Sequence, residues 1–138
     1  LWGLINSAGT ANPTASNEWL TKKDFVSVLD VNLLGLIDVT LHMLPFLRKA
    51  KGSVVNMSSM LGRLSFIGGG YPISKYGIEA FSNSLRQEMQ TLGVHVSVVE
   101  SGAFSTPIYD PPEESLQRIW HQLAPDIQET MGGSSWKC

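Results

Sequence analysis

The chain has 138 residues, 43% hydrophobic and 16% charged, and its ten Lys and Arg against twelve Asp and Glu give a formal net charge of −2. This length suffices for one domain with a real core. The near-neutral charge argues against a nucleic-acid-binding protein, which needs a basic surface to neutralise phosphates. The first residues show no basic-then-apolar pattern, so we expect no signal peptide within this sequence, and no uninterrupted apolar stretch reaches the ~18 residues of a membrane span. The single cysteine, Cys138, excludes an internal disulfide.

The first predicted element is a buried strand over residues 1–5, an apolar run that ends in a Gly-containing turn. After a polar loop, Thr21 and Asp24 are spaced as in a capping box, and apolar residues at helical spacing predict a helix from there toward Arg48. We expect Pro45 to bend this helix or to end it early. The residues expected on its buried side are Phe25, Val28, Leu29, Leu36, Val39, Met43 and Leu47.

Two further strands and a second long helix follow. Residues 53–57 predict a strand that places Ser58 and Ser59 at its carboxyl end. Residues 71–92 predict a helix, and residues 94–100 predict a third strand. The alternation of strands with long crossovers predicts an α/β fold with a parallel sheet, right-handed connections and helices on its faces.

The carboxyl-terminal part is less regular. Pro107, Pro111 and Pro112 indicate turns, and residues 113–131 have a helical pattern. Residues 132–138 show no periodicity, so we expect a disordered tail there and one domain over residues 1–131.

Tyr71 and Lys75 are the main candidates for chemistry, because residues four apart lie on one face of a helix. A lysine ammonium near a phenol favours the phenolate and lowers the tyrosine pKa from about 10. Such a tyrosine can take a proton from an alcohol or return one to a carbonyl. On its own the pair is equally explained as an exposed Tyr and Lys.

Two polar positions strengthen this hypothesis. Ser59 follows a buried strand, where ligands of open parallel sheets bind, and its hydroxyl could hold a substrate oxygen beside Tyr71. A simple strand-end turn explains the serines equally well. Asn32 interrupts an apolar helix stripe, so it is either a structural clamp or a link in a proton relay; its spacing alone favours the clamp.

Other chemistry-bearing residues are less informative. His42, His95 and His121 are scattered without metal-ligand spacing, so we expect no metal site. Phe104 and Trp120 are either core residues or the wall of an apolar substrate site.

Together these residues resemble the short-chain dehydrogenases/reductases. Asn32, Ser59, Tyr71 and Lys75 match the asparagine, serine, tyrosine and lysine of that family, and residues 6–9 are similar to its Asn-Asn-Ala-Gly turn. Longer stretches resemble the branch of retinol dehydrogenases and 3α/17β-hydroxysteroid dehydrogenases: Leu-Trp-Gly-Leu at 1–4, Asn-Glu-Trp-Leu-Thr at 17–21, Val-Asn-Met-Ser-Ser at 55–59 and Gly-Gly-Gly-Tyr-Pro-Ile-Ser-Lys-Tyr-Gly at 68–77. The resemblance covers residues 1–130 and implies the C-terminal portion of a doubly wound parallel-sheet Rossmann fold.

The resemblance also implies a role for each matched residue. Tyr71 is the general acid/base, Lys75 lowers its pKa and holds the nicotinamide ribose, Ser59 orients the substrate oxygen, and Asn32 keeps a water between Lys75 and solvent. The implied reaction is hydride transfer between the nicotinamide and a secondary or allylic alcohol carbon. The implied cofactor-binding residues are Asn6, Ala8, Gly9, Tyr71, Lys75, Gly102 and Thr106.

The chain departs from the family pattern in several places. Ser7 replaces an asparagine, and Ser101 replaces the proline of a Pro-Gly turn. Many members place the serine thirteen residues before the tyrosine, which here points to Ser58; we prefer Ser59 because this branch has the shorter interval. The glycine-rich phosphate loop is absent and is expected before the first strand. The glycines at 68–70 are expected instead to give backbone flexibility near Tyr71.

Two functional hypotheses follow. The first is an NAD(P)-dependent oxidoreductase acting on a lipophilic retinoid or steroid, with NAD preferred and NADP open. The second is an inactive truncated isoform or decayed copy without the phosphate-binding loop. By resemblance, the whole protein is expected at the endoplasmic reticulum membrane through a segment outside this sequence, and a homo-oligomer is compatible with it.

Overall fold

The structure, a computed structural model, describes residues 1–108 and 112–131; the side chains of Pro112 and Glu113 are not described. The expected tail at 132–138 and the turn residue Pro111 lie outside the described residues. The prediction of one domain over residues 1–131 therefore stays a prediction.

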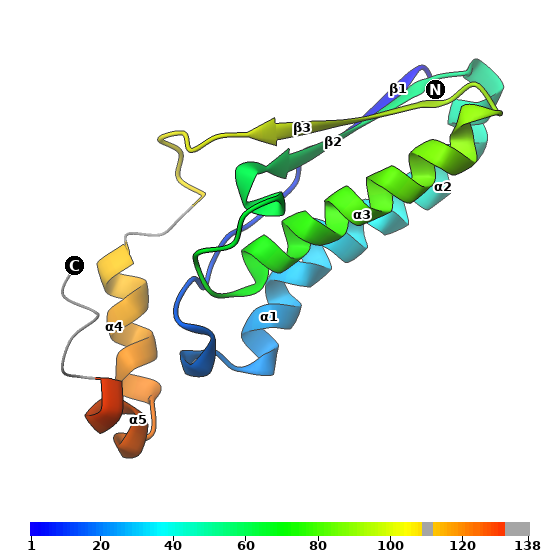
Figure 1. Ribbon diagram of the computed structural model, residues 1–138. Coiled ribbons are helices and arrows are strands. Elements are labelled where there is room, and N and C mark those ends of the chain that lie inside the picture. Colours follow the sequence, from blue (N-terminus) through cyan, green and yellow to red (C-terminus); the bar gives the residue numbers. More distant parts are fainter. Residues whose placement is uncertain (109–111, 132–138) are drawn as a thin grey trace.

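Three parallel strands form the sheet (Figure 1), as the sequence predicts. They are β1 (Gly3–Asn6), β2 (Ser53–Ser59) and β3 (His95–Ser101), in the order β1-β2-β3. Val54 in β2 pairs with Leu4 in β1 and with Val96 in β3, so one apolar residue from each strand lies in the same row. The carboxyl ends of the strands consequently lie at the same edge, which is where ligands of parallel sheets bind.

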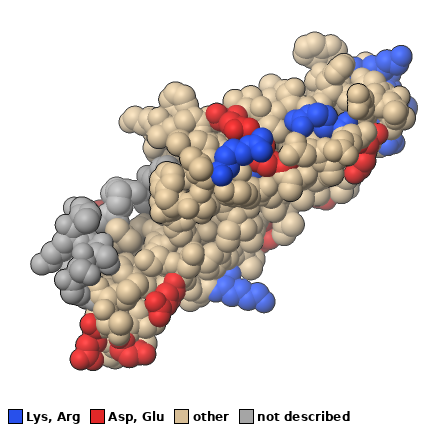
Figure 2. All heavy atoms as spheres, in the orientation of Figure 1, with Lys and Arg blue, Asp and Glu red and all other residues tan. Residues whose placement is uncertain are grey.

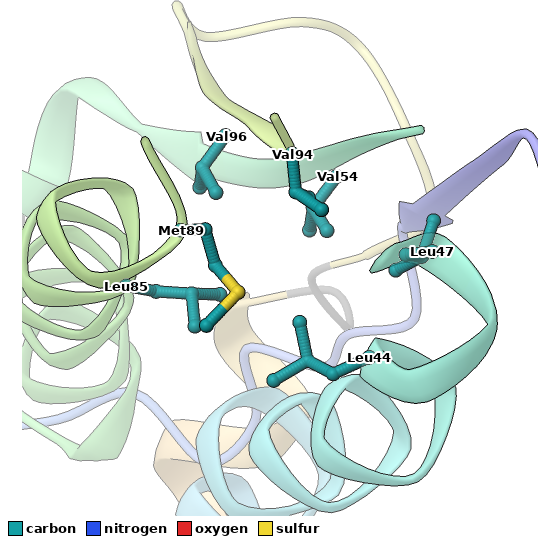
Figure 3. Packing of buried hydrophobic residues seen from close by; sticks show 7 residues of the cluster. All are labelled: Leu44, Leu47, Val54, Leu85, Met89, Val94 and Val96. Atoms are coloured by element: carbon teal, nitrogen blue, oxygen red, sulfur yellow. The ribbon is translucent and has the colours of Figure 1, made fainter. Parts of the chain in front are cut away.

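Helices α2 (Gly35–Ala50) and α3 (Gly70–Gln90) cover one face of this sheet, and α1 (Lys22–Leu29) packs against α3 (Figure 1). The sequence predicts helices on the faces of the sheet, and among the described residues α2 and α3 lie on one of them. The main core lies between the sheet and α2 and α3 (Figure 3). Its buried members are Leu44, Leu47, Val54, Leu85, Met89, Val94 and Val96.

The uncovered face corrects the expectation that residues 1–5 form a buried strand. Ile5 is 69% exposed and Leu1 50% exposed, and Val99 in β3 is 43% exposed. Successive side chains of a strand point to opposite faces, so these apolar residues have no layer to pack against among the described residues. Within residues 1–108 and 112–131, β1 is also an edge strand, because β2 alone pairs with it.

A π-helical turn, Asp30–Leu34, joins α1 to α2 and was not predicted. The capping box of Thr21 and Asp24 is confirmed at the start of α1. The π turn adds a residue to one helical turn and shifts the face that points inward. Thr40 is therefore buried in place of Val39, which is 43% exposed, contrary to expectation. Among the other residues expected inside, Val28, Leu36 and Leu47 are buried, whereas Phe25, Leu29 and Met43 are only partly buried.

Pro45 does not end its helix, since α2 continues to Ala50. A proline removes one helical hydrogen bond, but the turn beyond it carries Leu47, which is fully buried in the core. The packing of Leu47 accounts for the continuation.

The segment Lys22–Ala50 is also long and apolar enough, by length and composition, to cross a membrane. Polar residues interrupt its apolar run, which is why the sequence predicts no membrane span there. Some of its apolar side chains, such as Leu44, are buried in the core, while Leu34 and Leu41 are more than half exposed.

The three glycines before Tyr71 allow close packing instead of flexibility. A Cβ on Gly68 would clash with the carbonyl oxygen of Ala15, and Gly69 has a positive φ of 97°. A Cβ on Gly70 would lie 2.9 Å from Cβ of Val28. The start of α3 is therefore packed tightly against the loop before α1 and against α1 itself.

The helical pattern at 113–131 forms two helices and not one. They are α4 (Pro112–Gln122) and α5 (Pro125–Met131), and Pro125 begins the second because it lacks the N–H that a continuous helix needs there. Trp120 of α4 contacts Trp19 edge to face, with ring centroids 5.4 Å apart. In Figure 1 both helices lie away from the sheet, beyond the carboxyl end of β3.

Candidate active site

Tyr71 and Lys75 lie side by side in the first turns of α3, as their spacing predicts. Lys75 Nζ is 5.4 Å from the centroid of the Tyr71 ring and donates a hydrogen bond to the carbonyl oxygen of Met57 at 2.8 Å. Both side chains are buried, with 7% and 5% of their surface exposed. Burial lowers the pKa of Lys75, because desolvation disfavours the charged form. The helix thus places a cation next to the phenol inside the fold.

Ser59 lies at the end of β2 and lines the same cavity as Tyr71 and Lys75. Its Oγ accepts a hydrogen bond from the backbone N–H of Leu61 at 3.2 Å, so the turn after the strand orients the hydroxyl. Ser58 also lines the cavity, but its buried Oγ has no hydrogen-bond partner among the described residues.

Asn32 lies in the π turn and is fully buried. Its Oδ1 accepts a bond from the N–H of Thr10 at 2.8 Å, and its Nδ2 donates to the carbonyl oxygen of Thr10 at 2.8 Å and to Ser74 Oγ at 3.0 Å. Ser74 Oγ in turn donates to the carbonyl oxygen of Tyr71 at 2.7 Å. Asn32 therefore ties the loop after β1 to the helix that carries Tyr71, which is the geometry of a clamp.

A cavity of about 700 Å³ opens at the carboxyl ends of the strands. Of the residues expected at the cofactor, Gly9, Gly102 and Thr106 line it together with Tyr71 and Lys75, whereas Asn6 and Ala8 do not. The remaining lining residues are Ser7, Thr14, Met57, Ser58, Ser59, Met60, Leu61, Phe66, Ile67, Ser101, Ala103, Phe104 and Ile108. Phe104 therefore lines the cavity, one of the two roles expected for it, whereas Trp120 packs against Trp19.

The side chain of Asn6 points toward the helix-covered face of the sheet. Its Nδ2 donates to Asn56 Oδ1 at 2.8 Å and to Thr40 Oγ1 at 3.0 Å, and Asn56 Nδ2 donates to Ser82 Oγ at 2.9 Å. These four side chains form a polar network linking β1, α2, β2 and α3. Sequence reasoning missed it, although a buried Asn in an apolar strand such as β2 signals a need for hydrogen-bond partners.

The sequence reading also missed Phe66 and Ile67, whose side chains give the cavity apolar walls. They belong to an irregular loop, where no periodicity indicates which residues face inward. On the face drawn in Figure 2, several acidic side chains gather at the lower left end, while elsewhere acidic and basic side chains are interspersed among wide uncharged areas.

Comparisons with known proteins identify the family. The family model "short chain dehydrogenase" matches residues 1–116. Short-chain dehydrogenase/reductase family 9C member 7 from Bos taurus and retinol dehydrogenase 16 from Homo sapiens are each 54% identical to the chain over 134 residues. These matches cover 96% of this chain but only 43% and 42% of the relatives, so the chain spans less than half of their length.

Solved structures show the same fold. A short-chain dehydrogenase from Streptomyces avermitilis superposes with a TM-score of 0.68 at 23% identity, covering 96% of this chain and 64% of the other. Serine dehydrogenase from Escherichia coli also gives a TM-score of 0.68, at 26% identity, covering 86% of this chain and 55% of the other. The sheet is thus part of a doubly wound Rossmann-type fold, and the chain belongs to the short chain dehydrogenase family, in the branch of retinol dehydrogenases 7 and 16 and family 9C member 7.

Proposed function

We propose that this chain carries the catalytic residues of an NAD(P)-dependent dehydrogenase that interconverts an alcohol and a carbonyl on a retinoid or steroid. The observation that carries this proposal is the placement of Tyr71, Lys75 and Ser59 around one cavity at the carboxyl ends of a parallel sheet. An acid/base and a hydroxyl that can hold the reacting oxygen are then within one site.

In this proposal Tyr71 is the general acid/base. Its phenolate form accepts the proton of the substrate hydroxyl as the carbonyl forms, with the Lys75 ammonium beside the ring. The Ser59 hydroxyl donates a hydrogen bond to the substrate oxygen and keeps it beside Tyr71 Oη. Asn32 holds the start of α3 in register through Ser74, and we retain its second proposed role, fixing a water between Lys75 and solvent. In the reverse direction Tyr71 returns the proton to the oxygen.

The residues around the cavity fit the nicotinamide half of a dinucleotide. Gly9 and Gly102 border the cavity without side chains, and nothing lies within 4 Å of a Cβ built on Gly102. When bound, the nicotinamide supplies the two-electron acceptor or donor of the reaction. Thr106 and the ammonium of Lys75 are the proposed polar contacts. We propose NAD as the preferred cofactor by resemblance, with NADP as the alternative.

The substrate class rests on the cavity wall and on the relatives. Phe66, Ile67, Phe104 and Ile108 give the cavity apolar side chains, which suit a lipophilic alcohol or ketone. Matched relatives from three mammals are named retinol dehydrogenases. By the same resemblance we propose that the whole protein is at the endoplasmic reticulum membrane, through a segment outside this sequence.

The test uses the chain extended at its amino end with the region of human retinol dehydrogenase 16 that precedes the match. NAD-dependent oxidation of all-trans-retinol and of a 3α-hydroxysteroid is measured for this extended chain and for its Tyr71→Phe variant. We expect turnover of one substrate and a loss of about 10²-fold or more in the variant, because general acid/base catalysis contributes on that order. No turnover in the extended chain, or equal turnover in the variant, contradicts the proposal.

The second candidate is an inactive product without the phosphate-binding loop. Isothermal titration of the 138-residue chain with NADH separates the two candidates. Saturable binding at micromolar concentration counts against the inactive product, and no binding supports it.

A further inference from the structure

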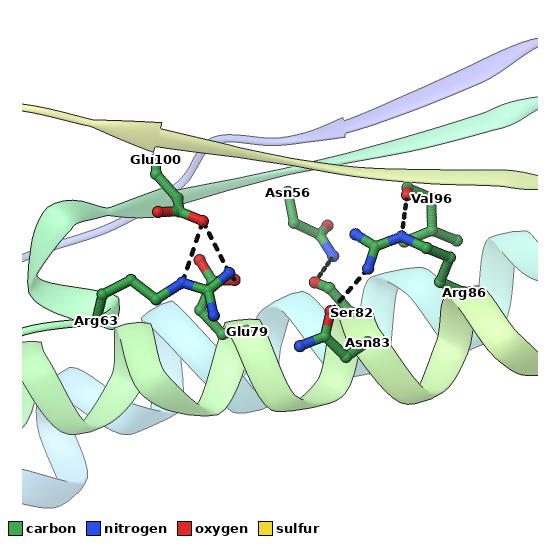
Figure 4. A network of polar contacts seen from close by, with 8 residues as sticks. All are labelled: Asn56, Arg63, Glu79, Ser82, Asn83, Arg86, Val96 and Glu100. Atoms are coloured by element: carbon green, nitrogen blue, oxygen red, sulfur yellow. Dashed lines mark hydrogen bonds and ion pairs between the residues drawn. The ribbon is translucent and has the colours of Figure 1, made fainter.

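Arg63 follows the turn at the end of β2 and lies between two carboxylates from different elements (Figure 4). Its Nε and Nη2 donate to Glu100 Oε1 on β3 at 3.2 and 2.9 Å. Its Nη2 is also 3.1 Å from Glu79 Oε2 on α3. The hydrogen bond to Glu100, followed by the charge of Glu79, raises the pKa of Arg63. One guanidinium therefore joins the sheet to the helix.

The backbone of Arg63 is held by the same helix. Its carbonyl oxygen accepts a hydrogen bond from Tyr76 Oη at 2.6 Å. Glu79 lies four residues after Lys75 and eight after Tyr71, so all three share one face of α3. The side chain of Arg63 is thus anchored to the helix face that presents the proposed acid/base.

The turn between Ser59 and Arg63 is packed directly against α3. A Cβ on Gly62 would lie 2.7 Å from Ser58 Oγ and 3.1 Å from the carbonyl oxygen of Lys75. The Leu61 N–H in this turn is the donor that orients Ser59 Oγ. A displacement of the turn away from α3 therefore moves the donor that sets the direction of the Ser59 hydroxyl.

The burial of Glu79 indicates that a gain in stability alone does not explain the ion pair between Arg63 and Glu79. The side chain of Glu79 is only 6% exposed, yet its Oε1 has no hydrogen-bond partner among the described residues, and neither does Ser58 Oγ beside Gly62. Leaving buried polar atoms unpaired costs free energy, so a half-satisfied ion pair is a poor device for stabilisation. The Arg63 contacts, in contrast, hold the turn after β2, the strand β3 and the helix α3 together.

We propose that Arg63 is a positioning residue which, through Glu79 and Glu100, holds the Ser59 turn against the Tyr71 helix. The inference rests on the proposed function for its effect on turnover, but the clamp itself is a property of the chain alone. Ser59 is then the substrate-orienting serine, and Ser58 belongs to the packing beneath the turn.

The clamp is tested first on the 138-residue chain by amide hydrogen exchange. In Arg63→Gln we expect exchange at Leu61 and Arg63 to rise about tenfold, since the turn opens locally without global unfolding. Arg86→Gln is the matched control. Arg86 lies on α3 and donates to the carbonyl oxygen of Val96 on β3 and to Asn83, so it also joins this helix to the sheet (Figure 4). Unchanged exchange in Arg63→Gln, or an equal rise in the control, overturns the clamp. Should Arg63→Gln not fold, Glu100→Gln at the exposed end of the pair serves instead.

The positioning role is tested in the extended chain by separating kcat from KM. We expect Arg63→Gln to lower kcat by about tenfold to a hundredfold, as small misplacements of reacting groups do, with KM for NAD unchanged and partial rescue by Arg63→Lys. The Arg86→Gln control should stay within about twofold of the parent. Raised exchange with unchanged kcat overturns the positioning role. Absence of turnover in the parent contradicts the proposed function, while the exchange of Leu61 still decides whether Arg63 holds the turn.

Discussion

The two faces of the sheet differ sharply. On the face covered by α2 and α3, Val54 and Asn56 of β2 are fully buried, one in an apolar cluster and the other in a hydrogen-bond network. On the opposite face, Ile5 is 69% exposed. Parallel sheets are normally buried on both sides. Here one face has its layer of helices and the other face is exposed. The candidate site belongs to the helix-covered side, because α3 and the end of β2 supply its residues.

The largest effect is expected where the covered face is most densely packed. Leu47 is fully buried in the main cluster (Figure 3), so Leu47→Ala should lower the free energy of unfolding by about 2–5 kcal/mol through lost transfer energy and a new cavity. Urea denaturation followed by circular dichroism measures this change. A loss below about 0.5 kcal/mol, the range of ordinary surface substitutions, would show that the covered face is not the stable one.

The polar network of the covered face should come next. Asn56 donates to Ser82 and accepts from Asn6, so Asn56→Ala removes both bonds and leaves the buried Ser82 Oγ without its donor, while Asn6 keeps its bond to Thr40. We expect a loss of about 1–3 kcal/mol, in line with the cost of unsatisfied buried polar groups. The matched substitution Ser97→Ala, at an exposed position of β3, should change stability much less. Equal losses in both variants would remove the distinction between the faces.

Replacing Lys75 should change stability in the opposite direction, by raising it at neutral pH. Burial lowers its pKa in the folded state, so the unfolded chain binds more protons between the lowered pKa and the ordinary value of about 10.4. The buried charge therefore costs stability at neutral pH, and the cost disappears as pH rises through this window. Lys75→Met should be more stable than the parent at pH 7, with a margin that shrinks toward pH 10, while the extended chain loses turnover. Thermal denaturation at several pH values checks this, and a margin that grows with pH would refute it.

The smallest effect on stability is expected on the uncovered face. Ile5→Thr removes an exposed apolar group and should change the free energy of unfolding by less than about 0.5 kcal/mol. The same substitution should reduce self-association in sedimentation velocity, because an exposed apolar edge strand is a site for pairing with another chain. Strong destabilisation would mean that Ile5 is buried in solution.

The sequence predicted the parallel sheet and the pairing of Tyr71 with Lys75, because both follow from local periodicity. It could not predict that Val39 turns outward, since the π turn at Asp30–Leu34 leaves no mark in the apolar pattern. Nor could it predict the continuation of α2 past Pro45, which depends on the tertiary packing of Leu47. The Arg63 contacts join three elements that lie far apart in the sequence, so no local signal indicates them.

The central claim is that this chain by itself builds the helix-covered half of the fold and, with it, the candidate site. Amide hydrogen exchange of the 138-residue chain tests this most directly. We expect slow exchange in α3 and in β2, which is bonded on both sides, and faster exchange in the edge strand β1. Uniformly fast exchange, with β2 and α3 no better protected than β1, would contradict it.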